Sequence, residues 1–167
     1  MKLIGQLKLS FDHVLIDCPA GIERGLRGLL NKHTDETILI STPDDVCIRN
    51  VERTASVLQG KDMPSPRLVV NMLDSELIDA GEMYSAAVVS QTLDLPLLGE
   101  VPRDPVVYRS LINHKPLMQC DCEARYALTR IAARMEGMDE PFPAYGVRKP
   151  GFFSRLFGRK HKEVNKL

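Results

Sequence analysis

The stretch Phe11-Asp-His-Val-Leu-Ile-Asp17-Cys-Pro-Ala-Gly21-Ile-Glu23 decides the fold class. Residues 13–16 form a short, mostly apolar run typical of a strand, and the proline and glycine that follow favour a turn. Residues 23–31 then predict a helix. A strand that ends in a lone Asp17 and turns into a helix places that carboxylate at the carboxyl edge of a parallel sheet, where open α/β sheets bind their ligands.

Asp17 allows two interpretations. In P-loop nucleotide-hydrolysing enzymes, an aspartate at this place orients magnesium and its waters, and a following glycine, here Gly21, lets a backbone N–H approach the terminal phosphate. Alternatively, Asp17 caps the next helix. The pattern of residues by itself leaves both interpretations open.

The rest of the body repeats the order of strand and helix. Further strands are predicted at residues 37–40, 67–70 and 95–101, and further helices at residues 44–58, 82–93, 104–113 and 123–138. This alternation predicts an α/β fold with a mostly parallel sheet and right-handed crossovers. Because the strands are continuously apolar, helices are expected on both faces of the sheet.

Composition excludes several classes of protein. The chain has 167 residues, of which 44% are hydrophobic and 26% charged, which is the balance of one ordinary globular domain. No apolar run approaches the roughly 20 residues of a transmembrane helix. Four cysteines do not make a disulfide framework in a chain of this length, so a reducing cytoplasm is expected. Cys120-Asp-Cys122 is a weak metal or redox signal and is better explained by packing.

The formal net charge of zero conceals two unlike parts. Residues 1–147 hold 15 basic and 21 acidic side chains, net −6, whereas residues 148–167 hold seven basic and one acidic, net +6. Between them, residues 139–150 contain three prolines and a glycine without periodicity, which predicts a linker. The basic end is therefore expected to act separately from the acidic body.

Residues 151–162 predict a short amphipathic helix. Phe152, Phe153, Leu156 and Phe157 cover an arc of about 140° at 100° per residue. Such a helix suits an anionic membrane surface. A terminal helix docked on the core or a basic arm for nucleic acid are the alternatives, but neither explains both the aromatic face and the charge. The predicted membrane-binding residues are Phe152, Phe153, Arg155, Leu156, Phe157, Arg159 and Lys160.

The segment Leu15-Ile-Asp-Cys-Pro-Ala-Gly-Ile-Glu23 resembles the Walker B and switch II segment of the MinD family of deviant Walker A ATPases. The family usually has serine where this chain has Cys18. The likeness spans nearly the whole chain in family order, through Ile40-Ser-Thr-Pro43, Val70-Asn71, Leu98-Gly-Glu-Val-Pro102 and Phe152-Phe-Ser-Arg-Leu-Phe-Gly158. It implies a partial, Rossmann-like P-loop NTPase fold with a carboxyl-terminal amphipathic helix.

The resemblance also implies site residues for ATP and Mg²⁺. Asp17 would hold magnesium through water, and Gly21 would sense the γ-phosphate, as the two catalytic residues. Asn71 would hydrogen-bond the adenine, with Pro102 and Arg103 against the base. Without the resemblance, Asn71 at a strand end is more simply a turn residue.

The glycine-rich phosphate loop of such enzymes does not occur among these residues. The motif G-x-x-x-x-G-K-[ST] is absent, and the single Gly-Lys pair, Gly60-Lys61, is followed by Asp62. We therefore expect residues 1–138 to represent the carboxyl-terminal part of a MinD-type ATPase domain, without the P-loop strand. Such a domain would expose a sheet edge and would neither bind nor hydrolyse ATP normally by itself.

The resemblance implies a cytoplasmic, peripheral membrane ATPase that places the division septum. It would dimerise, recruit a MinC-like inhibitor and respond to a MinE-like or other regulator, and no nucleic acid is expected. Asn50 stands where the family commonly has an acidic residue of the partner surface. The alternatives are a non-catalytic membrane adaptor that keeps the partner surface and tail, and a ParA-like partitioning protein.

Overall fold

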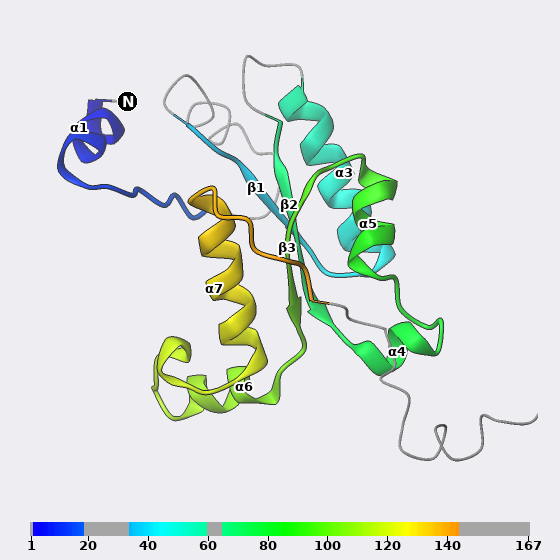
Figure 1. Ribbon diagram of the computed structural model, residues 1–167. Helices are drawn as coiled ribbons and strands as arrows, with labels where there is room; N and C mark the ends of the chain where they lie inside the picture. The colour runs from blue at the N-terminus through cyan, green and yellow to red at the C-terminus, as the bar shows by residue number, and fades with distance from the viewer. Residues whose placement is uncertain (1, 19–33, 60–64, 144–167) are drawn as a thin grey trace, which may run out of the picture.

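The computed structural model describes residues 2–18, 34–59 and 65–143. Its sheet contains β1 (Ile38–Ser41), β2 (Arg67–Leu73) and β3 (Leu97–Pro102), in that spatial order and all parallel (Figure 1). Parallel strands need crossover connections, and helices supply them here. The three strands confirm the predictions at residues 37–40, 67–70 and 95–101.

Helices cover both faces of the sheet, as the apolar strands predict. In Figure 1, α3 (Asp45–Gln59) and α5 (Ala86–Leu93) lie on one face, and α7 (Glu123–Met135) lies on the other. The remaining helical elements are α1 (Lys2–Ser10), α4 (Ser75–Asp79), α6 (Pro105–Ile112) and the 3-10 turn η1 (Leu117–Gln119). Each face therefore has its own hydrophobic core.

The first core lies between the sheet, α3 and α5, and the second lies between the sheet and α7. The buried members of the first are Val51, Ala55, Leu68, Val70, Leu73, Ala86, Val89, Leu93 and Leu95. Those of the second are Val69, Leu98, Val101, Cys120, Cys122, Ala124, Ala127 and Ile131. Cys120 and Cys122 are free thiols inside this core, consistent with packing.

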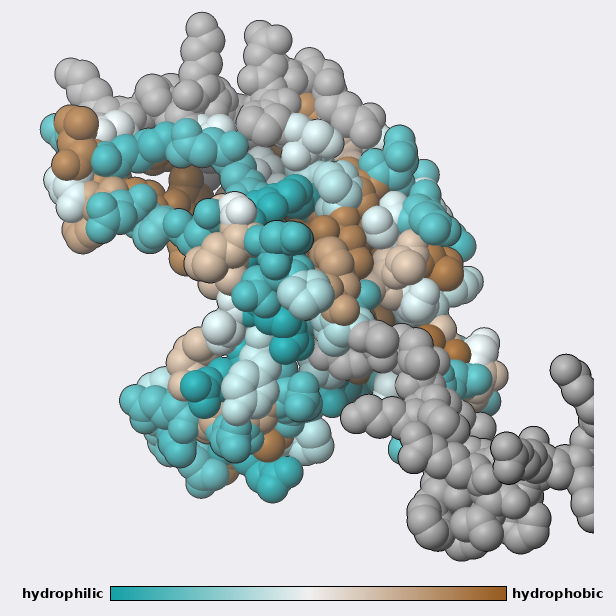
Figure 2. Space-filling model, viewed as in Figure 1, coloured by the Kyte–Doolittle hydropathy of each residue, from teal (hydrophilic) through white to brown (hydrophobic). Residues whose placement is uncertain are grey.

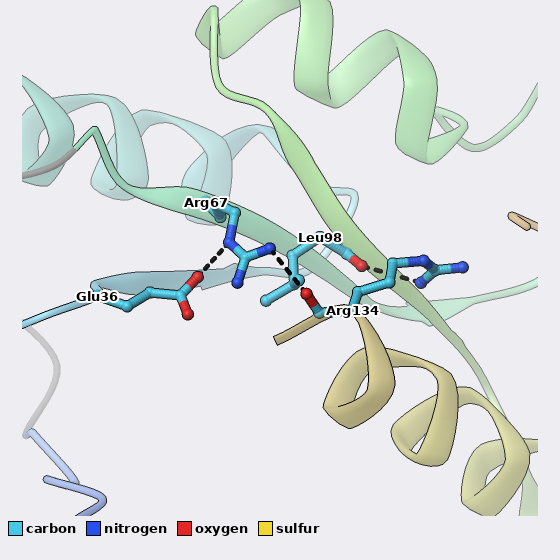
Figure 3. A network of polar contacts seen from close by, with 4 residues as sticks. All are labelled: Glu36, Arg67, Leu98 and Arg134. Carbon is cyan, nitrogen blue, oxygen red and sulfur yellow. Dashed lines mark hydrogen bonds and ion pairs between the residues drawn. The ribbon is translucent and has the colours of Figure 1, made fainter. Parts of the chain in front are cut away.

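A polar network fastens α7 to the sheet (Figure 3). Arg67, the first residue of β2, pairs with Glu36 just before β1 and donates to the backbone oxygen of Arg134 at 3.4 Å. The Arg134 guanidinium in turn donates to the backbone oxygen of Leu98 in β3 at 2.9 Å. All three strands and the last turn of α7 are thus joined through two guanidinium groups.

The strand predicted at residues 13–16 is wrong. Residues 11–18 form neither helix nor strand, and β1 pairs only with β2 within the described part of the chain. Leu15 is 85% exposed and Ile16 is 41% exposed. The physical reason is that an apolar run becomes a strand only when a neighbouring strand accepts its backbone hydrogen bonds.

Helix α1 was not predicted, and it stands apart from the sheet in Figure 1. Its Leu3 and Leu9 are 65% and 89% exposed, so it buries little, and Figure 2 shows brown hydrophobic side chains at this end of the molecule. No helix within residues 2–18, 34–59 and 65–143 is long and apolar enough to span a bilayer.

Two predicted helices are shorter than expected at one end. The helix predicted at residues 82–93 begins at Ala86, because the Ser85 hydroxyl caps it by accepting from the Val88 N–H. The helix predicted at residues 123–138 ends at Met135. The predicted helices at residues 23–31 and 151–162 lie outside the described residues.

Candidate functional site

The carboxyl ends of β2 and β3 form the candidate site. Leu73 of β2 is in register with Pro102 of β3, and the Arg103 N–H donates to the Leu73 backbone oxygen at 2.7 Å. The two strand ends are therefore held together, and Asn71, Pro102 and Arg103 lie at one edge of the sheet. This is the edge at which open parallel sheets bind ligands.

A cleft of ≈ 460 Å³ opens at this edge. It is lined by the chain after β2, the chain after β3 and the start of α7, namely Leu73, Asp74, Ser75, Glu76, Pro102, Arg103, Asp104, Pro105 and Glu123. Asn71 does not line it. Pro102 and Arg103, predicted from the resemblance to lie against a base, thus contribute to one wall.

Two of the carboxylates in the cleft accept hydrogen bonds from backbone N–H groups at the starts of helices. One oxygen of Asp74 accepts from the backbone N–H groups of Glu76 and Leu77, at 3.1 and 3.4 Å, and so caps α4. Asp104 caps two helices, since it accepts from Val106 in α6 at 2.8 Å and from Ala124 in α7 at 3.2 Å. Within the cleft, Asp104 therefore joins the end of β3 to the starts of α6 and α7.

The electrostatics of Asp104 follow from these contacts. Burial raises its pKa, but the hydrogen bonds from Val106 and Ala124 outweigh burial, so that the pKa lies below its ordinary value. Glu100 behaves oppositely, because burial raises its pKa against the opposing charges of Arg134 and Arg130. Glu100 lies in β3 and is not among the residues that line the cleft.

Asn71 lies beside an irregularity of β2. The pairing of β2 with β3 shifts between Val70 and Leu73, and Met72 has a positive φ of 61°. The side-chain oxygen of Asn71 accepts from the Met72 N–H at 2.8 Å, which leaves its NH₂ group for another partner. A left-handed methionine is unusual backbone geometry, and such strain is typical of functional sites and tight turns.

Asp17 is not brought to this cleft. It is exposed, and His13, four residues before it, lies 3.5 Å from Glu136 just beyond the carboxyl end of α7. The cleft contains Glu123, at the opposite end of that helix. Gly21 and the predicted membrane-binding residues of the tail lie outside the described residues, and the described residues contain no cluster suited to hold a metal ion.

The sequence prediction missed two groups. Asp104 caps both α6 and α7. Its cap on α6 has a sequence signal in Asp104-Pro105, because an aspartate before a proline is typical of a helix start. Its second bond, to Ala124, joins residues 20 positions apart and has no local signal. The contact of Arg134 with Leu98 spans 36 positions and equally has none.

Comparison with known proteins then decides the relationship. Over 163 residues the chain is 32% identical to the septum site-determining protein MinD of Helicobacter pylori. The aligned region covers 93% of this chain and 60% of that protein. The chain is homologous to MinD. The MinD of Synechocystis is 34% identical over 143 residues, covering 84% of this chain and 53% of that protein. No family model matches the chain.

Solved MinD structures share the fold. The MinC:MinD complex of Aquifex aeolicus matches with a TM-score of 0.78 and 26% identity, over 87% of this chain and 61% of that chain. MinD of Pyrococcus horikoshii, solved with Mg-ADP, matches with a TM-score of 0.65 and 24% identity, over 81% of this chain and 54% of that one. The chain spans somewhat more than half the length of these MinD relatives. The partial P-loop NTPase fold is thereby confirmed.

Proposed function

We propose that this chain acts in division-site placement as a MinD-like peripheral membrane protein. The observation that carries the proposal is the 32% identity with a septum site-determining MinD over 93% of the chain. The fold supports it, since 87% of the chain matches the MinC:MinD complex of Aquifex aeolicus with a TM-score of 0.78. Its expected place is the cytoplasmic face of the cell membrane.

The proposed membrane contact is the basic, aromatic tail. Phe153 and Leu156 belong to its apolar face, and seven basic residues lie within residues 148–167. One short helix of this kind binds reversibly, because ordering it offsets much of the gain from apolar contact. Phe153→Glu or Leu156→Glu should abolish sedimentation of the chain with anionic vesicles at physiological salt. Undiminished sedimentation would contradict the membrane function.

For nucleotide binding, we propose only the contacts to the base and not those to the phosphates. A MinD relative was solved with Mg-ADP, and in this chain Asn71, Pro102 and Arg103 occupy the sheet edge that would face a base. The phosphate side does not fit, because the 167 residues contain no G-x-x-x-x-G-K-[ST] motif and Asp17 lies away from this edge. We therefore assign no hydrolytic step to this chain, and calorimetry with Mg-ATP should detect no tight binding.

The proposed partners are a MinC-like septum inhibitor, a MinE-like or other regulator and a second copy of the chain. Helix α3 offers an exposed row of polar residues that includes Arg49, Asn50, Glu52 and Arg53. Asn50 replaces an acidic residue that the resemblance implies for partner contact. Asn50→Asp should therefore strengthen capture of the inhibitor on vesicles, and Gln91→Glu, which adds the same charge at an exposed residue of α5, is the control. Equal capture by the unchanged chain and Asn50→Asp would contradict this contact.

The missing phosphate motif favours one second candidate, a non-catalytic membrane adaptor. An adaptor would hold the septum inhibitor on vesicles without nucleotide, whereas an ATPase would need ATP for the same recruitment. A flotation assay with vesicles, the chain and the inhibitor, with and without Mg-ATP, separates the two. Binding to DNA in place of vesicles would instead support a ParA-like partitioning protein.

A further inference from the structure

Helix α6 exposes large apolar side chains to solvent, which is unusual for a helix whose only role is to pack on the core. Its Ser110 is 5% exposed, and Val106 and Val107 lean on the second core cluster. In contrast, Tyr108, Leu111 and Ile112 are 69%, 68% and 60% exposed. Ser110 and the two valines of α6 thus face inward, whereas its three largest apolar side chains face outward, although large apolar residues are ordinarily the more buried ones.

The three outward residues of α6 lie on one side of the helix. Positions 108, 111 and 112 fall within an arc of about 100° on a helix of 3.6 residues per turn. Met118, in η1 just after α6, is a further apolar residue that is 53% exposed. We call Tyr108, Leu111, Ile112 and Met118 the α6 patch. Large apolar side chains that are exposed together on one side of a helix are typical of an interaction site.

The stretch of sequence that contains the α6 patch has basic side chains and no acidic ones, and the nearest acidic residues along the chain are Asp104, Asp121 and Glu123. No acidic residue occurs between Asp104 and Asp121, the longest such interval in residues 1–140. Arg109, His114 and Lys115 are exposed within it. The body as a whole is net −6 over residues 1–147, so this end differs from the rest of the domain.

The two acidic residues that border this interval each accept hydrogen bonds. Asp104 accepts backbone hydrogen bonds from two helices, and Asp121 accepts from the Tyr126 hydroxyl. In Figure 1, α6 lies at one end of the molecule, and the corresponding lobe in Figure 2 shows brown and tan side chains among teal ones. The α6 patch is therefore a set of exposed apolar side chains at an extremity of the domain, with the exposed basic residues Arg109, His114 and Lys115 in the same stretch of sequence.

We infer that the α6 patch is a second contact with an anionic lipid surface. This inference rests on the proposed membrane function and adds to it the face with which the domain meets the bilayer. An acidic body held near anionic lipid by a tail is repelled least where basic side chains stand without acidic neighbours in the sequence, and residues 105–120, which include α6 and η1, are such a stretch. Large apolar and aromatic side chains bordered by basic ones are the chemistry of interfacial binding.

Two contacts on one chain also strengthen each other. Once the tail has bound, the α6 patch meets the bilayer at high effective concentration, so that a weak contact contributes measurably. A basic border without apolar residues would suit nucleic acid equally well. The four large apolar side chains favour lipid, because phosphate backbones offer them nothing to bury against.

The test uses the full chain and vesicles of phosphatidylglycerol and phosphatidylethanolamine. Leu111→Glu should weaken vesicle binding by roughly tenfold, which corresponds to loss of one partly buried apolar side chain. Val88→Glu is the matched control, because Val88 is 43% exposed on α5 at the other sheet face. Circular dichroism of both variants should match that of the unchanged chain.

A second readout is independent of affinity. The chain contains no tryptophan, so Tyr108→Trp is a single reporter in the α6 patch. Its emission should shift to the blue on anionic vesicles and be quenched by brominated lipid. Tyr84→Trp, at a 47% exposed residue beside α3 and α5, should change in neither way.

The outcomes separate this inference from the proposed tail. If the chain floats with vesicles but Leu111→Glu binds equally and Tyr108→Trp emission is unchanged, the α6 contact is overturned while the tail stands. If Phe153→Glu binds as well as the unchanged chain but Leu111→Glu does not, the tail fails and the α6 contact stands. Failure of the unchanged chain to float overturns both.

Discussion

Gly99 is a residue at which β3 and α7 approach closely. A Cβ atom at Gly99 would lie 2.1 Å from Cγ1 and 2.6 Å from Cδ1 of Ile131, a distance at which atoms cannot coexist. Gly99→Ala should therefore lower the free energy of unfolding by about 1–3 kcal/mol, because α7 or Ile131 must shift. Urea denaturation measures the loss.

The matched control for Gly99 lies in α1. A Cβ at Gly5 would meet nothing within 4 Å, so Gly5→Ala should be neutral or slightly stabilising. Combining Gly99→Ala with Ile131→Ala should lose less stability than the sum of the single variants, because the smaller side chain makes room. Additive losses would show that the close approach is not the cause.

Asp104 belongs to the same scale, since one carboxylate caps α6 and also binds the start of α7. Asp104→Ala should lower the free energy of unfolding by about 1–2 kcal/mol at pH 7, the typical value of a lost cap. The pKa of Asp104 is lowered in the fold, so its contribution is complete above the unfolded pKa of about 3.9 and falls as pH drops through the folded value.

The pH dependence gives this prediction its check. The difference in unfolding free energy between the unchanged chain and Asp104→Asn should be larger at pH 7 than at pH 3, measured by urea denaturation at both. Asp139→Asn, at an exposed residue after α7, is the control and should show no such difference. An Asp104→Asn difference that does not vary with pH would rule out the charged cap.

At the scale of elements, Arg134 joins α7 to β3 and to the chain that follows. Its guanidinium donates to the backbone oxygens of Leu98, Glu140 and Pro141 at 2.8–2.9 Å, and it lies 3.9 Å over the Phe142 ring. A lysine cannot reproduce this planar fork. Arg134→Lys should therefore speed amide hydrogen exchange in residues 139–143, whereas Arg130→Lys, one turn earlier, should not.

The elements also separate what the sequence can predict from what it cannot. The runs 37–40, 67–70 and 95–101 predict strands because each is continuously apolar, and all three pair side by side. The run at 13–16 has the same local character but no neighbouring strand, so its backbone stays unpaired. The local sequence pattern shows which segments are suited to a strand, whereas a strand forms only where a neighbouring strand pairs with the segment.

The candidate site divides in the same way. Asn71 and Pro102 could be placed together from sequence, because the ends of neighbouring parallel strands meet at one edge. Asp17 was expected at that edge only because residues 13–16 were expected in the sheet. The left-handed Met72 and the second bond of Asp104 have no sequence signal, since both depend on the register of β2 with β3 and on α7.

At the scale of the whole molecule, opposite charges are segregated along the chain. Residues 1–147 carry net −6 and residues 148–167 carry net +6, so binding to lipid depends on which part lies nearer the surface. Exposed charges more than a Debye length apart, about 8 Å at physiological salt, are largely screened from each other. The tail can therefore bind anionic lipid although the chain is formally neutral.

This segregation predicts a specific dependence on salt and lipid. The chain should bind vesicles that contain phosphatidylglycerol, bind phosphatidylcholine vesicles at least tenfold more weakly, and lose affinity as salt rises from about 0.05 to 0.5 M, because each basic residue near anionic lipid contributes about 1 kcal/mol at low screening. Flotation across a salt series measures this. Replacing Lys160 and Lys162 with glutamine should flatten the salt dependence, whereas the same change at Lys2 and Lys61, in the acidic body, should leave it unchanged. Equal binding to both lipids at all salt concentrations would mean that apolar contact alone holds the chain to the membrane.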